Sequence, residues 1–368
     1  MKFNSQSSGL HAQRTNAFDA LRIGAALAVL FSHSFPIVGL AEPTLASAGL
    51  TLGTLSVGMF FCLSGCLVGR SWDRDPNIGR FTARRALRIF PGLIVSVAFT
   101  TFVVGSIATQ LTGSQYFSSI ETWGFFLSNA LMIGGVLDLP GAFESNPLRA
   151  ANGSLWTLRY EVLMYALLVA VAKIAPLRLT GKFMFLVFLG SWLGLTALEL
   201  SRLQVPLPLV WRIGLEIDAV HVARLGTFFF GGVAIQKLER AGAADRFLAA
   251  ALWVIVAFAP TKTAANLTLA FAVPYSMMVL AYGLPKFLRW KGSQDWSFGV
   301  YVYAFPIQQL VAIWYFKHQL TWFASTAIAL CMTLACAAIS WHVVEKPALA
   351  FKPKVKPNKF SEPNAPLH

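Results

Sequence analysis

Charged residues are scarce in this chain. Only 12% of its 368 residues are Asp, Glu, Lys or Arg, whereas 56% are hydrophobic and the mean hydropathy is +0.60. Soluble globular domains carry about 25% charged residues. The composition therefore excludes an ordinary soluble domain and predicts an all-α polytopic membrane protein.

Acidic residues are scarcer than basic ones, with 16 Asp and Glu against 30 Lys and Arg, so the formal net charge is +14. In a soluble protein this imbalance would suggest nucleic-acid binding. Here the basic residues stand in short connections between apolar runs, a distribution that sets membrane orientation and lipid contact. We therefore expect membrane lipids, and no nucleic acid, among the partners.

Cysteine is also sparse, with four residues. Cys62 and Cys66 fall in one apolar run and Cys331 and Cys336 in another, without the clustered thiols and imidazoles of a zinc site. We expect them to be small packing residues, and we expect no bound metal. Residues 1–17 are polar and lack the short apolar core and cleavage pattern of a signal peptide. We therefore expect them to be a cytoplasmic segment rather than a removable leader.

Apolar runs long enough to cross a bilayer, which takes about 20 residues, follow one another along the chain. Residues 69–88 carry the densest basic cluster and are therefore assigned to the cytoplasm. Two spans separate this connection from the N-terminus, which we therefore expect in the cytoplasm too, and an even number of spans places the C-terminus on the same side. The predicted domains are the N-terminal segment 1–17, a ten-helix membrane domain 18–345, and a basic, proline-rich cytoplasmic tail 346–368. We predict about ten spans, at residues 18–40, 50–68, 89–109, 155–171, 183–200, 219–236, 247–260, 264–283, 297–316 and 321–343.

One further apolar run, at residues 123–137, is short and interrupted by glycine. The connection 172–182 carries Lys173, Arg178 and Lys182 and should be cytoplasmic. That orientation fails if 123–137 also crosses the membrane. We therefore predict a re-entrant or interfacial segment within an outer loop at residues 110–154.

The first span contains an arginine and a histidine, and ionisable residues inside a membrane are costly and often functional. Arg22 and His33 are 11 positions apart, close to three helical turns, so they share one face at depths about 16 Å apart. Asp19 is a candidate partner for Arg22. His33 has no partner nearby in sequence. Either a group on another helix orients His33 for function, or it donates to a neighbouring carbonyl in a structural role.

A carboxylate enters the membrane with the span 155–171. Glu161 lies about 9 Å from the outer end of this span, and His33 lies about 10 Å from the outer end of its own. An imidazole and a carboxylate at one depth form the oriented pair that general-base catalysis on a hydroxyl uses. The alternative is that Glu161 pairs with Arg159 or Arg224 and is merely tolerated.

Five short motifs occur in a fixed order and span almost the whole chain. They resemble the motifs of acyltransferase family 3, a family of membrane proteins with a ten-helix core. Each motif alone is weak, but five in order are specific. The motifs are Phe18-Asp19-Ala20-Leu21-Arg22 followed by His33; Phe60-Phe61-Cys62-Leu63-Ser64-Gly65; Arg84-Arg85-Ala86-Leu87-Arg88-Ile89-Phe90-Pro91; Ser154-Leu155-Trp156-Thr157-Leu158 followed by Glu161 and Tyr165; and Glu345-Lys346-Pro347.

The resemblance implies an integral O-acyltransferase of the cytoplasmic (inner) membrane. It would move an acyl group, commonly acetyl, from cytoplasmic acyl-CoA to a hydroxyl of a cell-surface or lipid-linked carbohydrate. Acyl-CoA would be a co-substrate, and no cofactor would be bound permanently. His33 would be the general base, oriented by Glu161. The residues expected at the coenzyme are Arg22, Arg84, Arg85 and Arg88, and those expected at the acceptor are Trp156, Arg159, Tyr165 and Tyr301.

Two features qualify these assignments. Arg84, Arg85 and Arg88 have a second interpretation, as anchors that obey the positive-inside rule. Family members often carry Ser-Tyr-x-x-Tyr-Leu-x-His near the C-terminus, whereas this chain has Ala304 at the histidine position. That position therefore cannot supply the base, which gives His33 more weight.

A multi-pass transporter or flippase for a glycan or small solute is the alternative function. Many spans, a polar interior and Pro274 within a span are compatible with it. However, the two halves show no internal repeat, and charged residues concentrate in the first and fourth spans. Acyl turnover by the purified protein would identify an enzyme, whereas solute uptake without turnover would identify a carrier.

Overall fold

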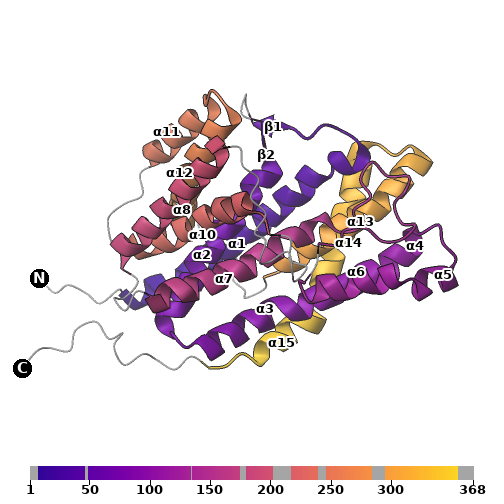
Figure 1. The fold of residues 1–368 in the computed structure, drawn as a ribbon, viewed down its shortest axis with the longest axis horizontal. Coiled ribbons are helices and arrows are strands. Elements are labelled where there is room, and N and C mark those ends of the chain that lie inside the picture. The colour runs from indigo at the N-terminus through magenta and orange to yellow at the C-terminus, as the bar shows by residue number, and fades with distance from the viewer. Residues whose placement is uncertain are drawn as a thin grey trace, which may run out of the picture.

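A computed structural model describes residues 7–45, 49–133, 135–174, 180–201, 217–238, 246–283 and 295–354. Within these residues the chain is a helical bundle, and the only strands, β1 (Thr44–Leu45) and β2 (Leu50–Thr51), form one small antiparallel hairpin (Figure 1). The helices are α1 (Ser7–His33), α2 (Leu52–Arg74), α3 (Ile78–Ala98), α4 (Ser106–Ala108), α5 (Gly113–Ser118), α6 (Ile120–Ala130), α7 (Trp156–Ile174), α8 (Gly181–Ser201), α10 (Ala219–Leu238), α11 (Arg246–Ala257), α12 (Lys262–Gly283), α13 (Ser297–His318), α14 (Trp322–Ser340) and α15 (Lys346–Ala350).

Eight helical segments of the described residues are long and apolar enough to cross a bilayer, and they coincide with eight of the ten predicted spans. The other two predicted spans contain α11, a helix of 12 residues, and α13, a helix of 22 residues. The all-α polytopic class is therefore confirmed. The count of ten and the cytoplasmic position of both termini stay predictions. The eight segments are Phe18–Val38, Leu52–Arg74, Ile78–Ala108, Gly153–Ile174, Gly181–Ser201, Ala219–Lys237, Lys262–Ala281 and Trp322–Ala350.

The predicted interfacial segment contains α6, a helix of 11 residues. At a rise of 1.5 Å per residue it spans about 16 Å, roughly half of the hydrocarbon core. Asn129 then closes a turn, because its Nδ2 donates to the carbonyl oxygens of Phe125 and Val136 at 2.9 and 2.8 Å. As predicted, α6 is too short to cross the bilayer.

Helices α2 and α10 pack with their backbones in contact. A Cβ at Gly65 would lie 2.0 Å from the carbonyl oxygen of Phe229, and a Cβ at Gly232 would lie 2.0 Å from that of Cys62. The Cys66 thiol also donates to the Gly232 carbonyl at 3.0 Å. Only glycine permits this approach, so these two glycines fix where α2 meets α10.

Helix α13 is deeply buried, since every residue from Ser297 to Ala312 is buried. Figure 1 shows α8, α11 and α12 on one side of the molecule and α3, α6 and α14 on the other, with α1, α2 and α7 between them. A π-helical turn, Trp341–Glu345, follows α14 and ends in a buried carboxylate. Such turns frequently occur at functional sites, and this one supplies part of the site described next.

Candidate functional site

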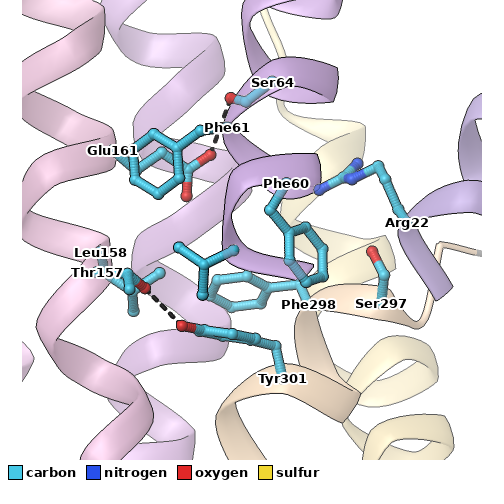
Figure 2. A pocket seen from close by; sticks show the side chains of 11 residues that line it. Arg22, Phe60, Phe61, Ser64, Thr157, Leu158, Glu161, Ser297, Phe298 and Tyr301 are labelled. Atoms are coloured by element: carbon cyan, nitrogen blue, oxygen red, sulfur yellow. Dashed lines mark hydrogen bonds between the residues drawn. The ribbon is translucent and has the colours of Figure 1, made fainter. Parts of the chain in front are cut away.

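Two cavities lie inside the bundle, separated by a shared wall. The inner cavity has a volume of about 50 Å³ and the outer cavity about 250 Å³. Arg22 lines the inner cavity, and His33, farther along α1, lines the outer cavity. Val57 and Tyr301 line both cavities and form the wall between them. The other inner residues are Phe60, Phe61, Ser64, Thr157, Leu158, Glu161, Ser297 and Phe298 (Figure 2). The other outer residues are Val29, Ser32, Glu42, Thr51, Gly53, Thr54, Trp156, His221, Arg224, Leu225 and Phe228.

Arg22 is held in the inner cavity by a carboxylate from the far end of the chain. Its Nη1 donates to Oδ2 of Asp295, 273 residues away, and Arg88 Nη2 donates to the same oxygen at 2.5 Å. Arg88 Nη1 lies 3.4 Å from Oε2 of Glu345, in the π-helical turn. The expected pairing of Arg22 with Asp19 is therefore wrong. Asp19 lies within electrostatic range of Arg22, but the hydrogen-bonded partner of Arg22 is Asp295.

The four arginines of α3 have different surroundings. Arg84 is buried and donates to Asp75 at 2.8 Å, and Arg80 binds the same carboxylate. Hydrogen bonds from Arg80 and Arg84 hold the pKa of Asp75 well below its usual range, against the opposing effect of burial. Arg84 is therefore committed to the connection between α2 and α3. The Nε atoms of both Arg84 and Arg85 are buried without a hydrogen-bond partner among the described residues, but Arg85 makes no ion pair with Asp75.

Glu161 and His33 are not brought together. Glu161 Oε1 accepts from Ser64 Oγ at 3.2 Å and from the Tyr165 hydroxyl, and Figure 2 shows its carboxylate pointing toward Ser64. The predicted pair thus fails to form, because equal depth on two helices does not fix the direction in which each side chain points. Arg224 is no partner either, since its Nη2 donates to Glu199.

His33 ends α1 at the outer cavity. Its Nδ1 is buried and has no hydrogen-bond partner among the described residues. The ring packs edge-on against Phe305, with centroids 5.2 Å apart. No carbonyl among the described residues accepts a hydrogen bond from Nδ1. The functional and the structural roles considered for His33 both stay predictions.

Sequence reasoning missed Glu42, the carboxylate of the outer cavity. Ser32 Oγ donates to Glu42 Oε1, and the Gly53 N–H donates to Ser32 Oγ at 2.8 Å. Burial raises the pKa of Glu42, although a hydrogen bond from the Gly53 N–H opposes the shift. Glu42 lies in a loop outside every predicted span, so neither periodicity nor depth pointed to it.

The four predicted acceptor residues lie in four different places. Trp156 lines the outer cavity and packs edge-on against His221, with centroids 4.9 Å apart. Tyr301 is in the wall, and its hydroxyl lies 2.6 Å from Thr157 Oγ1. Tyr165 binds Glu161 behind the inner cavity. Arg159 lines neither cavity; it faces a separate space of about 10 Å³ beside α6, and its Nη1 has no partner among the described residues.

Lys352, directly after α15, was also missed. Burial, followed by the positive charges of Arg85 and Arg88, lowers the pKa of Lys352 to about 8. Arg22 acts on Lys352 in the same direction. Arg22, Arg85, Arg88 and Lys352 are named the inner basic cluster below. No sequence pattern indicated this position, because Lys352 is one of several lysines in the basic tail.

Comparison with known proteins points in one direction. Residues 15–342 match a family model described as an acyltransferase domain. The chain is 30% identical over 350 residues to an O-acetyl transferase of Shigella phage Sf6, covering 90% of this chain and 96% of that one. It is 27% identical over 384 aligned residues to nodulation protein 10 of Rhizobium leguminosarum bv. viciae, covering 97% and 98% of the two chains. No solved structure matches the chain.

Proposed function

Because the chain belongs to acyltransferase family 3, and is thus a multi-pass membrane acyltransferase, we propose that it moves an acetyl group from cytoplasmic acetyl-CoA to a hydroxyl of a cell-surface or lipid-linked carbohydrate. Acetyl is proposed as the acyl group because one relative is named an O-acetyl transferase. The proposed location is the cytoplasmic (inner) membrane, because the densest basic connection, residues 69–88, fits the cytoplasmic side of such a bilayer.

The inner basic cluster supports coenzyme A as the donor. Phosphates are recognised by arginine and lysine through charge-assisted hydrogen bonds. Arg85 and Lys352 would bind the phosphates, and Arg22, which also lines the inner cavity, would polarise the thioester oxygen. Arg84 and Arg88 are left out of this proposal because Asp75 already occupies the guanidinium of Arg84, and Asp295 and Glu345 that of Arg88.

The outer cavity supports a carbohydrate acceptor. Its volume of about 250 Å³ is roughly five times that of the inner cavity. Binding sites for polar molecules combine apolar ring faces with a few fixed polar groups. Here Trp156 and Phe228 supply ring faces, and Glu42, His221 and Arg224 supply polar groups.

The chemistry requires a base, since a carbohydrate hydroxyl is a poor nucleophile. His33 would take the proton as the hydroxyl oxygen attacks the thioester carbonyl carbon. A C–O bond then forms, the C–S bond breaks, and the proton passes from His33 to the departing thiolate. The observations that support this assignment are that the His33 ring lines the cavity and that its buried Nδ1 has no hydrogen-bond partner among the described residues. Glu161, which lies within electrostatic range of Arg22, would balance charge in the inner cavity.

Two experiments test the proposal. The surface polysaccharide of a deletion strain should lack an O-linked acetyl ester that NMR and mass spectrometry find in the parent strain. The purified protein in liposomes should transfer labelled acetyl from acetyl-CoA to glycan extracted from the deletion strain. Identical glycans in the two strains, together with solute uptake that proceeds without thioester cleavage, would favour the transporter instead.

A further inference from the structure

The inner cavity is too small for a long acyl chain. Its volume of about 50 Å³ is roughly a third of the 150 Å³ of an engineered cavity that binds benzene. Since the larger cavity holds the six carbon atoms of benzene, a cavity of a third of that volume has room for about two carbon atoms. An acetyl group has two carbon atoms, the carbonyl carbon and the methyl.

The outer end of this cavity is a wall of three side chains, Val57 and Phe60 from α2 and Tyr301 from α13. The Tyr301 hydroxyl is held by Thr157 Oγ1 at 2.6 Å. The ring of Phe60 packs edge-on against that of Tyr301, with centroids 5.4 Å apart. Figure 2 shows Phe60 and Tyr301 standing between Arg22 and Thr157. These contacts fix the wall in place.

We propose that this wall restricts the donor to short acyl groups, with Phe60 as the specificity-determining residue. The inference rests on the proposed function, because it requires acyl-CoA to enter from the side of Arg22. The acyl tail then meets the wall before any other part of the donor. An acetyl methyl fits against Phe60 and Tyr301, whereas propionyl and butyryl tails do not.

The wall also sets the position of the reacting carbon. Val57 and Tyr301 line both the inner cavity and the cavity of His33, so an acyl group held against them lies next to the acceptor side. Each additional methylene adds a C–C bond of about 1.5 Å and holds the carbonyl carbon that much farther from the acceptor side. A misplacement of about 1 Å can cost roughly 10²-fold in rate. Long donors are therefore disfavoured twice, in binding and in reaction.

Competition binding tests the proposal without an acceptor. Acetyl-, propionyl- and butyryl-CoA would displace radiolabelled acetyl-CoA from the purified full-length protein. One methylene that does not fit an apolar pocket is worth roughly 10- to 200-fold. We expect butyryl-CoA to bind the wild type at least about tenfold more weakly than acetyl-CoA, and Phe60→Ala to remove most of that difference.

Phe99→Ala is the matched control. Phe99 is half-buried like Phe60 and packs edge-on against another tyrosine of α13, Tyr303, with centroids 5.5 Å apart, but it lines neither cavity. This variant loses the same side chain and should keep the wild-type ratio. Phe60→Leu makes the same test with a smaller change of volume if the alanine variant does not fold.

The outcomes separate the two proposals. A wild type that binds all three donors equally, or a Phe60 variant with an unchanged ratio, overturns selection by the wall and leaves the acyltransferase function standing. A wild type that binds no acyl-CoA overturns the proposed donor, and the selection with it. A ratio that changes equally in Phe99→Ala shows a general effect of lost packing, which also contradicts the role of Phe60.

Discussion

Lys352 should make donor affinity depend on pH. Its pKa of about 8 in the free protein means that about nine-tenths of the side chains are charged at pH 7 and about one-tenth at pH 9. A bound phosphate keeps the ammonium charged, so binding takes up a proton and weakens as the pH rises through 8. Phosphate monoesters have a second pKa of about 6, so the donor itself does not titrate in this interval. We expect affinity for acetyl-CoA to fall roughly tenfold between pH 7 and 9.

Equilibrium binding of labelled acetyl-CoA across this pH interval measures the effect. Lys352→Arg should bind with nearly constant affinity, because an arginine stays charged throughout. Lys354→Gln, a change at an exposed lysine two residues away, should retain the wild-type pH dependence. A flat wild-type profile would refute the reasoning, and so would an equal fall in Lys352→Arg, because the titrating group would then lie elsewhere.

Three further predictions concern the fold. Asp295→Asn leaves two half-buried arginines, Arg22 and Arg88, without their shared carboxylate. It should destabilise the protein by up to about 3–5 kcal/mol, measured as thermal unfolding in detergent; a change below 1 kcal/mol would contradict the network. Gly232→Ala should abolish assembly of the bundle, whereas Gly226→Ala, whose Cβ would meet only a flexible side chain at 3.6 Å, should express normally; equal expression would refute the close packing. Single cysteines at Glu121 and Asp138 in a cysteine-free background should both react with an impermeant thiol reagent from outside, and labelling from opposite sides would overturn the predicted topology.

Much of the fold follows from the sequence, because membrane helices must satisfy their backbone hydrogen bonds internally. Long apolar runs therefore predicted all eight candidate spans of the described residues. Neither α6, at the short run near Trp123, nor α11, which was predicted to cross, is among them, so the topology of both segments stays a prediction. Arg22 and His33 were correctly placed on one helix. Helix bounds and one-dimensional depth are local properties, which is why periodicity and charge suffice for them.

The contacts within the site did not follow from the sequence. The pairing of Arg22 with Asp295 joins residues 273 positions apart, and no local pattern indicates it. Glu161 was placed at the depth of His33, but its carboxylate faces Ser64. The rotation of a helix about its axis depends on packing against its neighbours, which a single sequence does not reveal. Glu42 was missed for a related reason, since a loop carboxylate becomes part of a cavity only when the loop folds over it.

The central claim is that His33 removes the proton from the acceptor, and transfer by His33→Gln tests it most directly. Glutamine preserves hydrogen bonding and approximate size but cannot accept the proton. We predict that His33→Gln folds, reaches the membrane at normal levels and binds acetyl-CoA as the wild type does, while acetyl transfer to the glycan falls about 10²- to 10⁴-fold. Near-normal transfer by this variant would contradict the account, because the proton would then have to be taken by another group.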